Sequence, residues 1–136
     1  MKSLATALIL SLSVGLMACQ AQGSASAAAG PGDVAAEALL LERLRTEIGS
    51  APCTSDAQCR TLGVGAKACG GPAAWWPWSD ANTRADRLQA WALELDQLQR
   101  ERLARSGQLS NCMVVPDPGA RCVARRCVLN DRASAR

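Results

Sequence analysis

The sequence predicts a small α+β domain held together by disulfide bonds, with two helices packed on a short antiparallel sheet. Three observations predict this class. Six cysteines lie between residues 53 and 127 of a 136-residue chain, which is long enough for one small domain and not for two. Two segments carry apolar residues at helical spacing. Short apolar runs bounded by Gly and Pro lie between and after these segments.

Residues 33–48 form the first expected helix. Asp33 is a suitable N-cap, and Gly49 supplies a stop. The apolar residues recur at helical spacing, at Val34, Ala38, Leu41, Leu44 and Ile48. Such a leucine-rich stripe is typical of a face packed on the domain's own core, and a partner-binding helix is the alternative.

The next segments are a strand and an aromatic loop. Residues 61–65 alternate apolar residues with glycine, which suggests a strand with a bulge or a close backbone approach. Residues 69–79 contain two glycines, two prolines and three tryptophans. The glycines and prolines predict an irregular, shaped loop.

A long helix is expected from Ser79 or Asp80 to about Arg105, followed by a stop at Gly107. Its buried face would carry Leu88, Trp91, Leu95 and Leu98. Some 26 helical residues span roughly 39 Å, which exceeds the expected width of so small a domain. Either the last turns project from the domain or the helix ends early.

Short strands and tight turns are expected in the last third of the chain. Residues 113–115 form a short apolar run, and residues 116–119 read Pro-Asp-Pro-Gly, a strong turn signal. Residues 121–123 and 126–129 are expected to form a hairpin with a tight turn at 124–125.

The cysteine count predicts three disulfides. Without Cys19, six cysteines remain, namely Cys53, Cys59, Cys69, Cys112, Cys122 and Cys127. Fifteen pairings are open. Three cysteines precede the long helix and three follow it, so at least one bridge must join the two groups and enclose that helix. Such a loop contributes roughly 4 kcal/mol on the chain-entropy model, so the domain should lose its fold on reduction. A zinc site using the Cys-x4-Cys spacing is the alternative, although the chain has no His.

The first 18 residues have the organisation of an export signal. Lys2 precedes an apolar run over residues 4–16 that is too short to span a bilayer. Leu16-Met17-Ala18-Cys19 resembles a bacterial lipobox. The resemblance implies a diacylglyceryl group on Cys19 and cleavage before it. An uncleaved anchor or an ordinary signal cut elsewhere is the alternative. The expected organisation is a signal peptide over 1–18, a lipidated N-terminus and flexible tether over 19–32, the domain over 33–130 and a frayed tail over 131–136.

Several activities lack support in the sequence. Without His, the common Ser-His and Cys-His nucleophile arrangements are absent. The carboxylates of residues 86–101 alternate with arginines, which is typical of a solvated helix face. Charges of both signs are interspersed at a net +3, so no basic face for nucleic acid is evident. We therefore expect no enzymatic activity, no cofactor, no metal and no nucleic-acid partner.

Two segments are candidates for binding. Trp75, Trp76 and Trp78 form either an exposed surface for a glycan or an envelope protein, or the core of a domain without Phe or Tyr. Residues 113–121 lie between Cys112 and Cys122 and could present a constrained loop, as small protease inhibitors do.

The cysteine motifs together resemble a known group. The order is Cys53-x5-Cys59-Arg60, then Gly63-x-Gly65-x-Lys67-x-Cys69-Gly-Gly-Pro72, then aromatics ending in Ser79, then Cys112 and Cys122-x4-Cys127. It is similar to uncharacterised bacterial secreted proteins and lipoproteins that share the Cys-Gly-Gly-Pro motif. The resemblance implies an exported disulfide domain and assigns no catalytic or binding residue.

The sequence therefore predicts a lipid-anchored protein of the bacterial cell envelope with a binding or structural role. Its expected partners are the membrane, through Cys19, and an envelope protein or glycan. Gln20 follows the lipidated cysteine where Asp would direct inner-membrane retention. In a cell with two membranes, the resemblance therefore implies the outer membrane, with the domain facing the periplasm.

Overall fold

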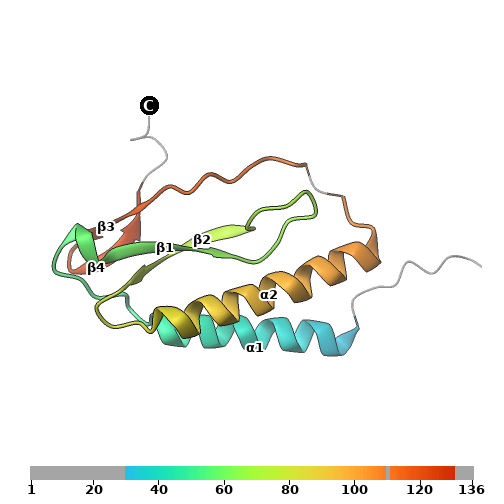
Figure 1. The fold of residues 1–136 in the computed structure, drawn as a ribbon, viewed down its shortest axis with the longest axis horizontal. Helices are drawn as coiled ribbons and strands as arrows, with labels where there is room; N and C mark the ends of the chain where they lie inside the picture. The colour runs from blue at the N-terminus through green and yellow to red at the C-terminus, as the bar shows by residue number, and fades with distance from the viewer. Residues whose placement is uncertain (1–29, 110, 131–136) are drawn as a thin grey trace, which may run out of the picture.

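A computed structural model describes residues 30–109 and 111–130 of the chain. The predicted signal peptide, Cys19, all but the last three residues of the predicted tether, and the tail 131–136 lie outside the described residues. Two antiparallel helices form one layer, a β-hairpin covers them, and an extended segment runs over the hairpin (Figure 1). The elements are α1 (Pro31–Ile48), a 3₁₀ turn (Asp56–Gln58), β1 (Cys59–Val64), β2 (Ala74–Ser79), α2 (Ala85–Ser106), β3 (Ala120–Val123) and β4 (Arg126–Leu129). The predicted class, a small disulfide-rich α+β domain, is confirmed.

The strands form two antiparallel pairs. Strand β1 pairs with β2, and β3 pairs with β4 through a tight turn at Ala124 and Arg125. Both turn residues have positive φ, 48° and 63°, as a two-residue hairpin turn requires. The predicted hairpin is therefore confirmed, while the expected single sheet is in fact two two-stranded sheets.

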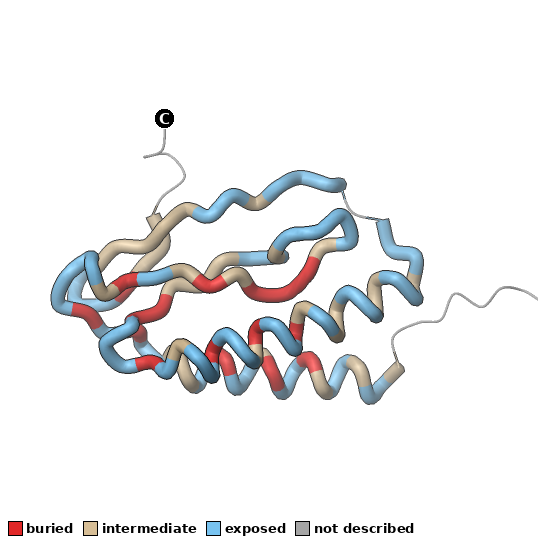
Figure 2. Tube along the Cα trace, viewed as in Figure 1, coloured by how far each residue is buried: buried red, intermediate tan, exposed pale blue. Residues whose placement is uncertain are grey.

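The main core lies between the helices and the inner face of the β1–β2 hairpin. Figure 2 shows the buried positions on the facing sides of these elements. The core residues are Leu40 and Leu44 of α1, Leu88, Ala92 and Leu95 of α2, and Leu62, Val64 and Trp78 of the hairpin. Each fully buried leucine contributes roughly 1.5–3 kcal/mol to folding. The first helix thus packs on the domain's own core, but the predicted stripe is only partly right. Leu44 is buried and Leu41 and Ile48 are partly buried, whereas Val34 and Ala38 are exposed and Leu40 is a core residue that the stripe did not include.

A polar contact joins the two helices to the hairpin. The Glu37 carboxylate accepts hydrogen bonds from Arg102 Nε at 2.7 Å and Gln99 Nε2 at 3.1 Å. Gln99 Oε1 in turn accepts one from the backbone N–H of Ala66 at 2.8 Å. Because Glu37 is 9% exposed, its charge requires these donors.

Helix α1 begins slightly earlier than predicted. Gly30 is the N-cap and Pro31 starts the first turn, where the missing N–H of proline removes no helical hydrogen bond. Asp33, the predicted cap, lies inside the first turn, and Oδ2 is 2.5 Å from Arg105 Nη2 at the end of α2. Gly49 ends the helix with φ 55°.

Helix α2 begins four or five residues later than predicted. Ser79 is the last residue of β2, and its carbonyl accepts from the N–H groups of Asn82 and Thr83 in a turn. Arg84 is the N-cap. The helix of 22 residues, about 33 Å long, ends at Gly107 as predicted, so the late start removes the excess length.

The Trp-rich segment is partly a strand, so the prediction of an irregular loop over 69–79 is wrong for residues 74–79. Pro77 is tolerated in β2 because this strand pairs with another strand on one side only. Proline lacks only the backbone N–H, the group that would donate a hydrogen bond to a neighbouring strand. The glycines act before the strand, where Gly70 and Gly71 have φ of 92° and 76°.

Residues 111–119, which we call the strap, run over the outer face of the β1–β2 hairpin (Figure 1). The predicted strand at 113–115 is not formed. Side chains take the place of a β-ladder: Lys67 Nζ donates to the Met113 carbonyl, and Trp75 Nε1 donates to the Val115 carbonyl at 2.9 Å. Thr61 Oγ1 donates to Asp117 at 2.7 Å.

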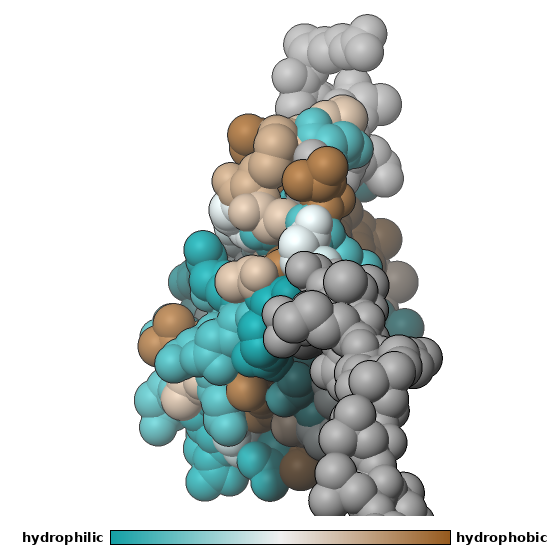
Figure 3. Space-filling model, turned by 90° about the vertical axis from the view of Figure 1, so that its right-hand side faces the viewer, coloured by the Kyte–Doolittle hydropathy of each residue, from teal (hydrophilic) through white to brown (hydrophobic). Residues whose placement is uncertain are grey.

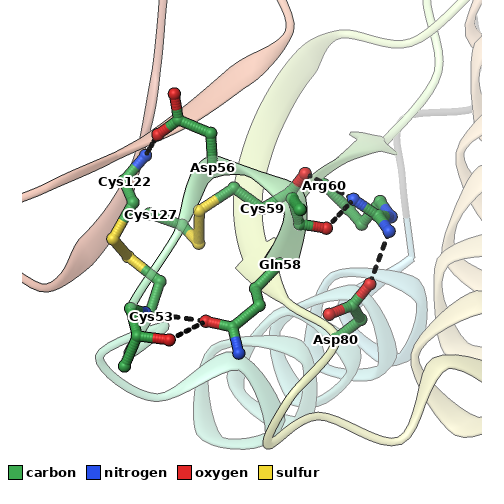
Figure 4. Close-up of a disulfide and its surroundings, with 10 residues drawn as sticks. Cys53, Asp56, Gln58, Cys59, Arg60, Asp80, Cys122 and Cys127 are labelled. Carbon is green, nitrogen blue, oxygen red and sulfur yellow. Dashed lines mark hydrogen bonds and ion pairs between the residues drawn. A yellow bond between two sulfur atoms is a disulfide. The ribbon is translucent and has the colours of Figure 1, made fainter.

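All three disulfides join the chain before α2 to the chain after it. The pairs are Cys53–Cys122, Cys59–Cys127 and Cys69–Cys112. The expectation of at least one such bridge is confirmed. The first two lie close together and clamp the β3–β4 hairpin, while Asp56 accepts a hydrogen bond from the Cys122 N–H at 2.7 Å (Figure 4).

Candidate ligand pocket

Strand alternation separates the three tryptophans. Trp76 and Trp78 point to the helices, whereas Trp75 points to the outer face. Trp78 is buried at 6% exposure. Trp75 is half-buried and hydrogen-bonded to the strap. The three rings therefore do not form one exposed platform. Trp75 and Trp76 line two different pockets, and the larger of these two contains Trp76.

A pocket of about 610 Å³ lies where the end of α1 meets β2 and β4. We call it the Trp76 pocket. Its lining residues are Arg45, Ile48, Gly49, Ser50, Ala51, Trp76, Pro77, Arg126 and Cys127. Apolar groups form most of this surface, and the two arginines supply its charge.

The backbone after α1 positions this pocket. Gly49 stops the helix, and Ala51 then adopts φ 49°, which is unusual for a residue with a Cβ atom. The Ala51 carbonyl accepts from the Cys127 N–H at 2.8 Å, and Cys127 is bonded to Cys59 of β1. The disulfide and this hydrogen bond therefore fix β4 beside the end of α1. A left-handed Ala costs of order 1 kcal/mol, which the buried surroundings of Ala51, 3% exposed, sustain.

The pocket is positively charged. The Arg45 guanidinium lies 5.3 Å from the centre of the Trp76 ring. Its acidic neighbour Glu42 is 3.9 Å away, and both side chains are more than half exposed, so solvent screens this pair. Arg126 makes no ion pair with any described residue. No lining residue is acidic.

The helix end opposes this charge only weakly. The C-terminus of α1 carries about half a negative charge, against two full guanidinium charges. The Gly49 N–H also satisfies one of the terminal carbonyls, that of Arg45. The pocket therefore retains a net positive potential, with an aromatic ring and a proline ring beside the charges.

The sulfur atoms near the pocket are committed to disulfides. Those of Cys53, Cys59 and Cys127 lie within 4.8 Å of one another, but each belongs to a bridge. A metal requires thiolates, and Cys122 and Cys127, the candidate zinc pair, are bonded to different partners. The bridged form offers no cysteine ligand there.

Two of the four carboxylates predicted on the solvated helix face, Asp96 and Glu101, make local contacts within α2. Asp96 Oδ2 is 2.6 Å from Arg100 Nε, and this hydrogen bond raises the pKa of Arg100. Glu101 accepts from Gln97. Asp117 accepts from Thr61 and, at 2.8 Å, from the N–H of Gly119 in its turn. These contacts fit the local roles that the sequence suggested.

Glu47 has the one resolved carboxyl pKa shift among the described residues. Its Oε1 accepts from the Arg84 N–H at 3.0 Å and lies 3.4 Å from Arg84 Nε. The backbone hydrogen bond is the larger cause, and together these donors lower the pKa of Glu47 despite its partial burial. Glu47 thereby ties the end of α1 to the start of α2.

Sequence reasoning did not identify Arg45 and Arg126. Arg45 stands among other charged residues of a helix, and Arg126 neighbours a cysteine like several other residues. Only the fold brings the last turn of α1 to β4. A signal did exist for Trp76, because clustered tryptophans predicted either a surface or a core.

Comparisons of the chain with protein-family models, curated proteins and solved structures find no match. Within residues 30–109 and 111–130, no helix combines the length and apolar character needed to cross a membrane.

Proposed function

We propose that this protein is a lipid-anchored cell-envelope protein with a binding role, and that the Trp76 pocket holds its ligand. The lipobox-like Leu16–Cys19 segment and the resemblance to bacterial lipoproteins support the anchor. Three disulfides support an oxidising compartment. The observation that carries the binding role is a pocket with an apolar wall, two arginines and no acidic lining residue.

The pocket suits an organic anion with a ring. Its volume, about 610 Å³, falls within the roughly 300–1,000 Å³ typical of small-molecule sites. Trp76 and Pro77 offer flat apolar surfaces for a ring, and Arg126 and Arg45 offer donors for a carboxylate or phosphate. An acidic sugar of an envelope glycan and a small aromatic acid share this chemistry.

The anchor is tested by replacing its cysteine. Cys19→Ser should move the protein from the membrane fraction to the soluble envelope fraction with all three disulfides intact. Gel mobility after alkylation of free thiols reports the bridges. A Cys19→Ser protein that remains in the membrane fraction would refute the lipid anchor.

The pocket is tested on the Cys19→Ser chain with 1-naphthoate and its neutral analogue 1-naphthamide, followed by tryptophan fluorescence. Naphthoate should bind about tenfold more tightly, which corresponds to about 1.4 kcal/mol for the added charge. Arg126→Gln should remove this preference, and raised salt should weaken it. The matched control is Arg125→Gln, because Arg125 does not line the pocket. This variant should keep the preference for naphthoate. Glucuronate in place of naphthoate distinguishes a sugar from an aromatic ligand. Equal binding of naphthoate and naphthamide would contradict the proposal.

A second candidate function, protease inhibition, is favoured by the form of the strap. It is extended between two disulfide-bonded cysteines, and Met113 and Val114 are 67% and 85% exposed. Rigid presentation of such side chains lowers the entropic cost of binding. The soluble Cys19→Ser chain should then slow envelope proteases, and Val114→Asp should abolish the effect. No inhibition of serine or cysteine proteases at micromolar protein would exclude it.

A further inference from the structure

Three highly exposed apolar side chains lie within five positions of one another at one end of the domain. Leu109 is 98% exposed, Met113 is 67% exposed and Val114 is 85% exposed. We call them the terminal patch. The backbone next to Met113 and Val114 is held by the Cys69–Cys112 disulfide and by the hydrogen bond from Lys67 to the Met113 carbonyl. Exposing these side chains to water is unfavourable, so several of them at one end of the domain point to a partner.

The chain enters the domain at this same end. Helix α1 starts there, beside the end of α2 (Figure 1). The Asp33–Arg105 ion pair holds the two helix ends together at 2.5 Å, and Leu109 follows four residues after Arg105. Val34, in the first turn of α1, is also 55% exposed. Viewed onto this end, hydrophobic side chains gather in the upper part, above a largely hydrophilic lower part (Figure 3).

The length of chain before α1 limits what can meet the terminal patch. Gly30 follows Cys19 by 11 residues. Even fully extended, this segment reaches no more than about 40 Å. A lipid on Cys19 therefore keeps this end of the domain close to the bilayer at a high effective concentration.

We propose that the terminal patch inserts into the surface of the bilayer that carries the Cys19 lipid, an inference that rests on the lipid anchor proposed above. Leu109, Met113 and Val114 enter the boundary between headgroups and acyl chains, about 5–10 Å deep. The interaction is mainly apolar, because Arg105 at this end is paired with Asp33, which leaves Lys67, the donor to the Met113 carbonyl, as the basic group beside the patch. It therefore forms on zwitterionic lipid and changes little with salt.

This orientation sets how far the ligand pocket lies from the bilayer. The terminal patch lies near the start of α1, and the Trp76 pocket lies at its end. The 18 residues of α1 separate the two by about 27 Å. The pocket therefore lies at the end of the domain away from the bilayer.

The experiment uses the lipidated full-length protein in phosphatidylcholine vesicles, with or without brominated acyl chains that quench tryptophan. Met113→Trp adds a reporter to the patch. Leu93→Trp adds one to the middle of α2, at a residue that is 68% exposed, and is the matched control. After subtraction of the parent signal, the Met113→Trp emission should shift to the blue and lose at least about half its intensity to brominated lipid at an insertion depth of this order. The Leu93→Trp emission should not change.

Flotation of the vesicles separates the two proposals. A protein that does not float with the vesicles refutes the lipid anchor itself. A protein that floats but shows equal, unquenched emission from both variants refutes insertion of the terminal patch. The strap would then be free for the protease of the second candidate function. Quenching that disappears at high salt would also contradict the apolar mode of insertion.

Discussion

Removal of one disulfide tests how much each of the two neighbouring bridges contributes to the stability of the β3–β4 hairpin. Cys59–Cys127 closes a chain separation of 68 residues, which alone would contribute roughly 4.4 kcal/mol on the chain-entropy model. Cys53–Cys122 is its neighbour. With that bridge intact, the effective loop is the path through it, only about 11 residues, and the contribution falls to roughly 3 kcal/mol.

The double substitution Cys59→Ala and Cys127→Ala should therefore leave a folded domain. A loss of about 3 kcal/mol lowers the melting temperature by roughly 10–20 °C in a domain of this size. Removing Cys53–Cys122 as well should unfold it, because the combined loss of about 6 kcal/mol is comparable to the total stability of small domains. Thermal unfolding followed by near-ultraviolet circular dichroism measures both steps.

Two results would refute this reasoning. If the variant that lacks only Cys59–Cys127 is already unfolded at 25 °C, Cys53–Cys122 does not shorten the loop that the Cys59–Cys127 bridge closes. If the variant without both bridges keeps its melting temperature, the hairpin is held by packing rather than by cross-links. Full reduction should likewise abolish the near-ultraviolet signal.

Two further predictions concern carboxylates between the helices. Glu37→Gln should lower the free energy of unfolding by about 1–2 kcal/mol in a denaturant titration, because the partly buried Arg102, 23% exposed, loses its counter-charge. The control is Glu42→Gln, at a residue 70% exposed, which should change the free energy of unfolding by less than about 0.5 kcal/mol. The folded-state pKa of Glu47 lies below its usual 4.5, so its contribution is present at neutral pH and is lost as the pH falls from about 4.5 through the lowered value. Glu47→Gln should accordingly flatten stability against pH in this range, and an unchanged acid slope would contradict the assigned role of the Arg84 contact.

Local patterns predicted the helices and the terminal hairpin well. Helical spacing located both helices, and Gly49 and Gly107 ended them where expected. The start of α2 was missed because Ser79 has the side chain of an N-cap but is the buried end of β2. Ser79 belongs to a strand because it pairs with Cys59, and no residue near Ser79 in the sequence indicates this contact.

The strap and the pocket could not be predicted for a related reason. An apolar run such as 113–115 favours a strand. The carbonyls of Met113 and Val115 instead accept hydrogen bonds from the side chains of Lys67 and Trp75, which are more than 35 residues away in the sequence. Likewise, Arg45 and Arg126 are 81 positions apart, and both line the pocket only because the disulfides hold β4 beside α1. Disulfide pairing decides both outcomes, and cysteine spacing leaves that pairing open.

Under the export proposed above, the disulfide pattern has a consequence for the order of events in folding. Every native partner of Cys53, Cys59 and Cys69 lies at least 43 residues further along the chain. A chain that emerges from a translocation channel with its N-terminus first therefore exposes three thiols before any correct partner has arrived. A bond formed among these three at that stage is non-native and must be rearranged. Oxidative folding thus begins productively only after α2 has crossed, and the rate of thiol exchange in the receiving compartment governs the yield of folded protein.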